Sequence, residues 1–323
     1  MTSSGHRATS RVYSATQQTL VVAVLKPVDR MMLPRHSILA AILQLGEAIG
    51  EFVRDGDTVA LEGFTHLIPF AAGHEIIRRK LRGLTVIRMT PDVIYDQLIG
   101  AGCVAKIVFS WGGNPGVGSL HRLRDAIEKK WPNPIEVEEH EHAGMAAAYA
   151  AGASHLPFGV LRGYVGTDLP KHNPNIRFID CPFTGEKLAA VPAHRPDVTV
   201  IHAQKADRKG NVMMWGVVGA QKEAVMAAKR SIVTVEEIVD NLNAPPNSVI
   251  LPAWVVTAVS EVKGGAFPSY AQGYYTRNNA FYKHWDNIAK ERETFLKWID
   301  EHVMGTKDFA EFKKSIERVV AHA

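Results

Sequence analysis

The sequence has few cysteines and no long apolar run. Only Cys103 and Cys181 occur among its 323 residues, and they form no CxxC pair. This excludes a disulfide-stapled scaffold and a zinc site made of cysteines, and it is typical of a reducing compartment, so we expect a cytoplasmic protein. No stretch approaches the ~18 apolar residues that a membrane helix needs, so we expect no membrane association.

An excess of charge of one sign is also missing. The 37 Lys and Arg residues against 33 Asp and Glu residues leave a formal net charge of +4, and no basic run exceeds three residues. We therefore expect no nucleic-acid partner, whereas small anionic ligands remain compatible with this balance. Hydrophobic residues make up 46% of the chain, which is enough for a large core and excludes a disordered or fibrous chain.

The start of the chain lacks acidic residues until Asp29 and is rich in Ser, Thr and basic residues. The apolar stretch 20–25 is short, and Lys26 and Pro27 follow it instead of a cleavage site, which argues against a signal peptide. We expect residues 1–36 to be a disordered leader or an over-extended start, although their composition also suits a transit peptide. Residues 37–323 are expected to form a single α/β domain with C-terminal helices from about residue 281.

Helical and strand patterns alternate from residue 37 onward. They predict helices at 37–54, 71–82, 91–100, 120–131, 143–151 and 218–230, and strands at 58–61, 84–89, 106–111, 135–139, 197–203, 231–236 and 248–251. Ser37 and Thr90 are the expected caps of the first and third helices. This alternation indicates a doubly wound, mostly parallel sheet with helices on both faces.

Ligands of such sheets bind beyond the carboxyl ends of the strands, and two segments stand at that place. The first follows strand 58–61 and comprises Glu62, Gly63, Phe64, Thr65 and His66. The second follows strand 106–111 and comprises Gly112, Gly113, Asn114, Gly116, Val117, Gly118 and Ser119, with Pro115 between them. Its glycines could present backbone N–H groups to a phosphate or a developing oxyanion. It has neither a Walker sequence nor the third glycine of a dinucleotide fingerprint, and a tight turn remains the alternative.

Two further segments are polar where a strand ends. Glu139 lies in the run 138–142, whose two histidines are two positions apart; a metal site, a polar pocket wall and plain surface are the alternatives. Since no third ligand is indicated by spacing, we expect no metal. His202 and Gln204 form the other segment, and they could line a pocket or simply begin a loop. A GxSxG elbow is missing, so a serine hydrolase is not expected.

Read together, these segments are similar to the alpha subunit of family I CoA-transferases, and most of all to the alpha subunit of glutaconate CoA-transferase and its relatives. The resemblance covers about residues 37–305 and lies in segments 55–65, 97–100, 114–117, 156–158, 191–192, 201–204, 207–210 and 265–269. It implies a heteromeric enzyme that moves CoA from an acyl-CoA to a carboxylic acid, with coenzyme A as cosubstrate and no permanently bound cofactor.

In this family a glutamate attacks the thioester, and a glutamyl-CoA thioester follows, so that two easier acyl transfers replace one difficult exchange. That glutamate belongs to the beta subunit, in a Glu-Asn-Gly-type motif that this chain lacks. The resemblance therefore implies that this chain forms half of the active site in an α2β2 complex with a CoA-transferase beta subunit.

Two positions depart from the family pattern. Glu62 replaces the first of two glycines, and Phe267 stands where a histidine is usual. Glu62 is thus a candidate catalytic residue, because a carboxylate beside an acyl pocket can act as a general base. Hydrolysis or ring opening of a CoA thioester is therefore the alternative to transfer. A non-catalytic ligand-binding or regulatory protein is an alternative of another class, although residues 1–36 do not have the pattern of a DNA-binding head.

Overall fold

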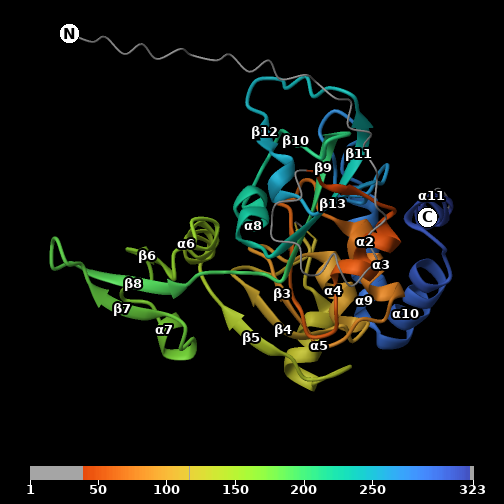
Figure 1. The fold of residues 1–323 in the computed structure, drawn as a ribbon. Helices are drawn as coiled ribbons and strands as arrows, with labels where there is room; N and C mark the ends of the chain where they lie inside the picture. The colour runs from red at the N-terminus through yellow and green to blue at the C-terminus, as the bar shows by residue number, and fades with distance from the viewer. Residues whose placement is uncertain (1–38, 116, 321–323) are drawn as a thin grey trace, which may run out of the picture. The chain divides into compact units, whose positions relative to one another are not determined.

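A parallel β-sheet forms the centre of the chain. The computed structural model describes residues 39–115 and 117–320. The main strands follow in the order β1 (Ala41–Ile42), β13 (Ala258–Glu261), β11 (Arg230–Val239), β9 (Val198–Asp207), β2 (Thr58–Glu62), β3 (Leu84–Ile87), β4 (Val104–Phe109) and β5 (Glu136–Glu139), and each neighbouring pair is parallel (Figure 1). β10 (Val212–Met214) extends the sheet by antiparallel pairs with β9 and β12 (Val249–Leu251).

Helices cover both faces of this sheet. One layer contains α2 (Leu45–Phe52), α3 (Phe70–Arg78), α4 (Val93–Gly100), α5 (His121–Lys129) and the C-terminal helices α9 (Asn279–Lys290), α10 (Arg292–Trp298), η2 (Ile299–Met304) and α11 (Phe309–Val320). The other face carries α6 (His142–Ala153) and α8 (Gln221–Ala227). The prediction of a doubly wound, mostly parallel α/β fold is confirmed.

Alternate residues of a strand enter the two layers of the core. In β2, Val59 and Leu61 belong to the large cluster with α2, α3 and α4, whereas Ala60 packs with Met145 and Tyr149 of α6. Because successive side chains of a strand point to opposite faces, Glu62, two residues after Ala60, points toward α6. This alternation places the candidate catalytic carboxyl of Glu62 against α6.

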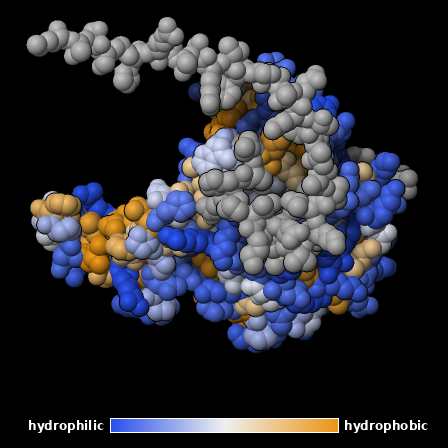
Figure 2. Space-filling view, viewed as in Figure 1, coloured by the Kyte–Doolittle hydropathy of each residue, from blue (hydrophilic) through white to orange (hydrophobic). Residues whose placement is uncertain are grey.

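A second, antiparallel sheet of three strands was not predicted. Its order is β6 (Phe158–Leu161), β8 (Lys187–Pro192) and β7 (Arg177–Asp180), and one face packs on α6 through Ala148, Ala189 and Val191. Phe158 and Val160 remain 43% and 44% exposed, and hydrophobic side chains gather on the surface over this sheet (Figure 2). The short helix α7 (Leu169–His172) lies in the connection between β6 and β7, and η1 (Ala253–Val255) follows β12.

The helix predicted for 37–54 is wrong in its first part. β1 occupies that part and pairs with β13, so the chain enters the sheet before α2 begins. Gln44 and Glu47 then form a capping box that satisfies backbone groups at the start of α2. Ser37, the expected cap, and the proposed leader 1–36 lie outside the described residues. Within the described ranges, no helix is long and apolar enough to cross a membrane.

Candidate active site

The loops at the carboxyl edge of the parallel strands contact one another. β2 runs beside β9, with Glu62 opposite Ile201, and the loop after β2 pairs with a loop far along the chain. Ser269 Oγ donates to the carbonyl of Thr65 over 2.7 Å, and the Gln272 N–H donates to His66 Nε2 over 2.9 Å. The segment after β13 therefore covers the first predicted site segment.

Glu62 is buried at the last position of β2. Only 2% of the residue is exposed, and its Oε1 accepts from the Tyr149 hydroxyl over 2.8 Å and from the Met89 N–H over 3.1 Å. Burial raises the pKa of Glu62, and the nearby Arg88 guanidinium opposes that rise. The structure thus holds the carboxyl in a network of protein donors; its role in catalysis stays a prediction.

A buried ion pair supports the loop that follows Glu62. Arg88 Nη1 lies 3.0 Å from Asp92 Oδ1, and Nη2 donates to the Gly63 carbonyl over 2.7 Å. Both residues are 1% exposed. Asp92 also caps α4, where Ile94 N–H lies 3.4 Å from Oδ1, so the cap is Asp92 and the expected Thr90 cap is wrong. Asp92 is the cap in place of Thr90 because its carboxylate accepts hydrogen bonds both from the Arg88 guanidinium and from the backbone at the start of α4.

The loop itself is closely packed. A Cβ on Gly63 would lie 2.7 Å from the Leu67 carbonyl oxygen, so this position needs a glycine. Thr65 and Leu67 have φ of 59° and 54°, which few residues with a side chain adopt. Such backbone strain persists only where the surroundings hold it, and it concentrates at functional sites. Phe64 and Thr65 are partly exposed at the surface of this loop.

The glycine-rich segment forms a closed turn. Gly113 N–H donates to the Pro91 carbonyl over 3.2 Å, and Asn114 and Gly118 exchange hydrogen bonds, with Val117 N–H also donating to Asn114. Four of the backbone donors that could serve an anion are thus used inside the protein. Gly112 and Gly118 are exposed and Ser119 is partly exposed, whereas Gly116 lies outside the described residues. Anion binding by this loop stays a prediction.

The histidines near the carboxyl edge are buried and fully engaged. His66 Nε2 accepts from Gln272, so its proton lies on Nδ1, which donates to the Val217 carbonyl over 2.9 Å. Burial lowers the pKa of His66, in agreement with a neutral ring. Gln204 forms two hydrogen bonds with the backbone of Trp215: its Nε2 donates to the carbonyl, and its Oε1 accepts from the N–H. These side chains position the loops around the edge.

His202 lies against a carboxylate that the sequence analysis missed. Its Nε2 is 2.7 Å from Glu236 Oε1, and Nδ1 is 2.8 Å from Thr234 Oγ1. Burial raises the pKa of Glu236, but hydrogen bonds from His202, Gly264 and Tyr275 outweigh it, and the net shift is downward. Only the pairing of β9 with β11 could have indicated this dyad, because the two residues are far apart in the chain.

Glu139 stands apart from these loops at the end of β5, and it is exposed. Its neighbour His140 is buried and is 2.9 Å from Glu138, which also pairs with Lys106 at 2.8 Å. Burial raises the pKa of Glu138, but hydrogen bonds from His140 and Lys106 prevail and lower it to about 2. In the described part of the chain, no three His, Cys, Asp or Glu side chains gather as around a metal ion.

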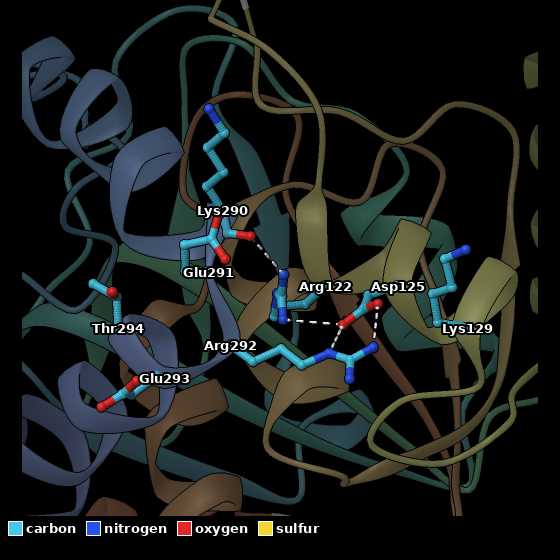
Figure 3. A pocket seen from close by; sticks show the side chains of 8 residues that line it. All are labelled: Arg122, Asp125, Lys129, Lys290, Glu291, Arg292, Glu293 and Thr294. Carbon is cyan, nitrogen blue, oxygen red and sulfur yellow. Dashed lines mark hydrogen bonds and ion pairs between the residues drawn. The ribbon is translucent and has the colours of Figure 1, made fainter.

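A charged hollow of about 570 Å³ lies between α5 and the start of α10. Its central groups pair with each other: Arg292 donates twice to Asp125, at 2.7 and 2.8 Å, and Arg122 pairs with Asp125 at 3.1 Å (Figure 3). Because its central charges are paired with one another, we interpret this hollow as the contact that joins α5 to the C-terminal helices.

Comparison with known proteins identifies the family. The profile of the coenzyme A transferase family matches residues 42–262, most of the chain. This chain belongs to the coenzyme A transferase family. It is 68% identical over 278 residues to the alpha subunit of 3-oxoadipate CoA-transferase of Pseudomonas knackmussii, covering 86% of this chain and 99% of the relative. It is 31% identical to the alpha subunit of glutaconate CoA-transferase of Acidaminococcus fermentans, covering 85% of this chain and 91% of that relative.

The fold agrees with these matches. The crystal structure of glutaconate coenzyme A-transferase from Acidaminococcus fermentans superposes with a TM-score of 0.81 at 30% identity, over 87% of this chain and 94% of that one. The resemblance stated from the sequence is confirmed: the chain is the alpha subunit of a CoA-transferase, a family of enzymes that use CoA as cosubstrate. Transfer is thereby favoured over hydrolysis and over a non-catalytic role.

Proposed function

We propose that this chain, with its beta subunit, transfers CoA between an acyl-CoA and a dicarboxylic acid, and that the acid is 3-oxoadipate. The 68% identity to the alpha subunit of a 3-oxoadipate CoA-transferase, over nearly the whole of that relative, carries the proposal. The more distant relative is named for glutaconate, another dicarboxylic acid. Both relatives are therefore named for a substrate with two carboxylates.

In the proposed mechanism the nucleophile is a glutamate of the beta subunit. Its carboxylate attacks the thioester carbonyl, the C–S bond breaks, and CoA leaves as thiolate from an acyl-glutamyl anhydride. The thiolate then attacks the glutamyl carbonyl, releases the first acid as carboxylate and leaves a glutamyl-CoA thioester, which the second acid opens by the reverse steps. Each attack develops an oxyanion, which needs fixed hydrogen-bond donors.

This chain contributes the wall opposite that glutamate, formed by the segments 62–66 and 112–119 with His202 and Gln204. The buried Arg88–Asp92 pair and the hydrogen bonds to Ser269 and Gln272 support such a role, because they hold the first loop in one conformation. We also propose an α2β2 assembly, no permanently bound cofactor and a cytoplasmic location. The unpaired cysteines, Cys103 and Cys181, support a reducing compartment.

Trapping of the covalent intermediate tests the proposal. The co-purified two-subunit complex is treated with hydroxylamine or borohydride, before and after an acyl-CoA is added. We expect inactivation only after the acyl-CoA is added, with the modified glutamate in the beta subunit. Modification of Glu62, or release of free CoA without transfer to 3-oxoadipate, would contradict the proposal and favour hydrolysis.

A further inference from the structure

Arg277 lies in the segment between β13 and α9, beside the glycine-rich turn. It is half-buried, and its Nη2 donates to the Pro115 carbonyl over 2.9 Å. Its guanidinium lies 4.1 Å from the centre of the Tyr282 ring, and Tyr282 is itself tied to the turn by Asn114 Nδ2, which donates to its carbonyl over 2.7 Å. The stack and the hydrogen bond fix the plane of the guanidinium.

The charge of Arg277 has no counter-ion within the described part of the chain. The other arginines whose described side chains are not exposed each have a carboxylate within 4.0 Å: Arg78 with Glu75, Arg88 with Asp92, Arg122 with Asp125, and Arg230 with Asp57. The charge of Arg277 opposes the rise that burial causes in the pKa of Asp92, but the Asp92 carboxylate is already paired with Arg88. A half-buried cation without a paired carboxylate is costly, so an anion from outside this chain is expected to meet it.

Unpartnered polar atoms gather at the same place. Arg277 Nε, Asn114 Oδ1, Arg88 Nε and Asp92 Oδ2 are buried, and none has a hydrogen-bond partner among the described residues. They belong to one locality, because Tyr282 contacts Arg277 and Asn114 directly, and the hydrogen bond from Gly113 N–H to the Pro91 carbonyl joins the segment of Asn114 to that of Asp92, the partner of Arg88. The two donors among them, Arg277 Nε and Arg88 Nε, suit an acceptor such as a carboxylate oxygen, whereas the two acceptors, Asn114 Oδ1 and Asp92 Oδ2, need a donor such as water.

We propose that Arg277 binds the distal carboxylate of the substrate, the one that does not carry CoA, and so selects dicarboxylic over monocarboxylic acids. The inference rests on the proposed function and deepens it. The reacting carboxyl must reach the glutamate of the beta subunit, whereas Arg277 lies against Pro115, in the wall that this chain contributes. The planar guanidinium fork matches the two oxygens of a carboxylate, and its fixed plane reduces the entropy lost on binding. A phosphate of CoA shares this anionic chemistry, and the test separates the two.

The experiment compares two acids that differ only at the distal end. 3-Oxohexanoate has the length and the 3-oxo group of 3-oxoadipate but ends in a methyl group. For the two-subunit complex we expect Arg277→Gln to lower kcat/KM for 3-oxoadipate about 30- to 100-fold, mainly through KM, the scale of losing charged hydrogen bonds. The value for 3-oxohexanoate should stay within about threefold, and Arg277→Lys should fall between the wild type and Arg277→Gln.

Arg124→Gln is the matched control, because Arg124 is an exposed arginine of α5 that pairs with Glu128. It should leave both values unchanged. If wild type does not prefer 3-oxoadipate over 3-oxohexanoate, the dicarboxylate part of the proposed function fails, whatever Arg277 does. If wild type has the preference and Arg277→Gln and Arg277→Lys keep it, the inference about Arg277 is overturned.

Two further outcomes also overturn it. A rise in KM for the acyl-CoA that is equal for both acids would assign Arg277 to a CoA phosphate. An equal loss of kcat for both acids, with a lower Tm, would assign it to support of the glycine-rich turn. If Arg277→Gln fails to assemble, Arg277→Lys is tested by inhibition with adipate and hexanoate, and an unchanged adipate-to-hexanoate ratio of inhibition constants counts against the inference.

Discussion

Glu62→Gln separates transfer from base-catalysed chemistry at this site. Glutamine has nearly the size of glutamate and keeps an oxygen that can accept from Tyr149 and Met89, but it cannot remove a proton. In the wild type the Gly63 N–H donates to the Glu62 carboxylate and stabilises its charged form. In Glu62→Gln an amide nitrogen, which cannot accept a hydrogen bond, takes the place of that oxygen. The expected change in the free energy of unfolding is about 1–3 kcal/mol, the scale of one mismatched buried hydrogen bond.

The effect on activity should be small. Transfer by the proposed covalent route needs no general base on this chain, so CoA exchange by the two-subunit complex should survive within about tenfold, or ~1.4 kcal/mol in barrier height. A general base contributes about 10²- to 10⁴-fold. A loss of more than about a hundredfold in Glu62→Gln, in a complex that still assembles and binds acyl-CoA, would refute our reasoning. Glu128→Gln, at an exposed position of α5, is the control.

The same variant tests the burial of Glu62. Because its pKa is raised in the folded protein, the carboxyl contributes stability below its ordinary value of 4.5, and that contribution is lost as pH rises through the raised value. The glutamine that replaces it does not titrate. The Tm of Glu62→Gln relative to wild type should therefore improve as pH rises from 4.5 into the neutral range; a constant difference would show that Glu62 is not buried in solution.

Three other predictions concern assembly, packing and pH. Expressed alone, the chain should not turn over CoA thioesters, and with its beta subunit it should elute as a heteromer in size-exclusion chromatography; robust turnover by the isolated chain would contradict this. Gly63→Ala should lower the Tm and kcat/KM, because its Cβ would meet the Leu67 carbonyl at 2.7 Å, whereas Gly46→Ala in α2, whose Cβ would meet the ends of the flexible Glu75 and Arg79 side chains at 3.3 and 3.6 Å, should be close to wild type. An unaltered Gly63→Ala enzyme would mean that the loop is mobile. Burial raises the pKa of Asp96 to about 6, so its stabilising contribution is lost between pH 3.8 and about 6. Asp96→Asn should remove that part of the pH dependence of Tm, and an unchanged profile would exclude Asp96 as its source.

Local patterns in the sequence determined most elements of the fold. Turn glycines, apolar strands and amphipathic helices predicted the parallel sheet between residues 58 and 139, because these signals arise from neighbouring residues. The position of Glu62 at a carboxyl edge followed from the strand before it. The family resemblance depended on the order and spacing of short segments, which a sequence displays directly. These features need no knowledge of distant contacts.

Tertiary structure alone decided the partners of the polar groups. The dyad of His202 with Glu236 depends on which strands are neighbours, and Tyr149 reaches Glu62 because strand parity turns that carboxyl toward α6. Only the tertiary structure shows that Arg277 hydrogen-bonds to the glycine-rich turn and stacks on Tyr282. It also shows that, among the described residues, no carboxylate pairs with Arg277. Burial and pairing are properties of residues far apart in the chain, and no local periodicity records them.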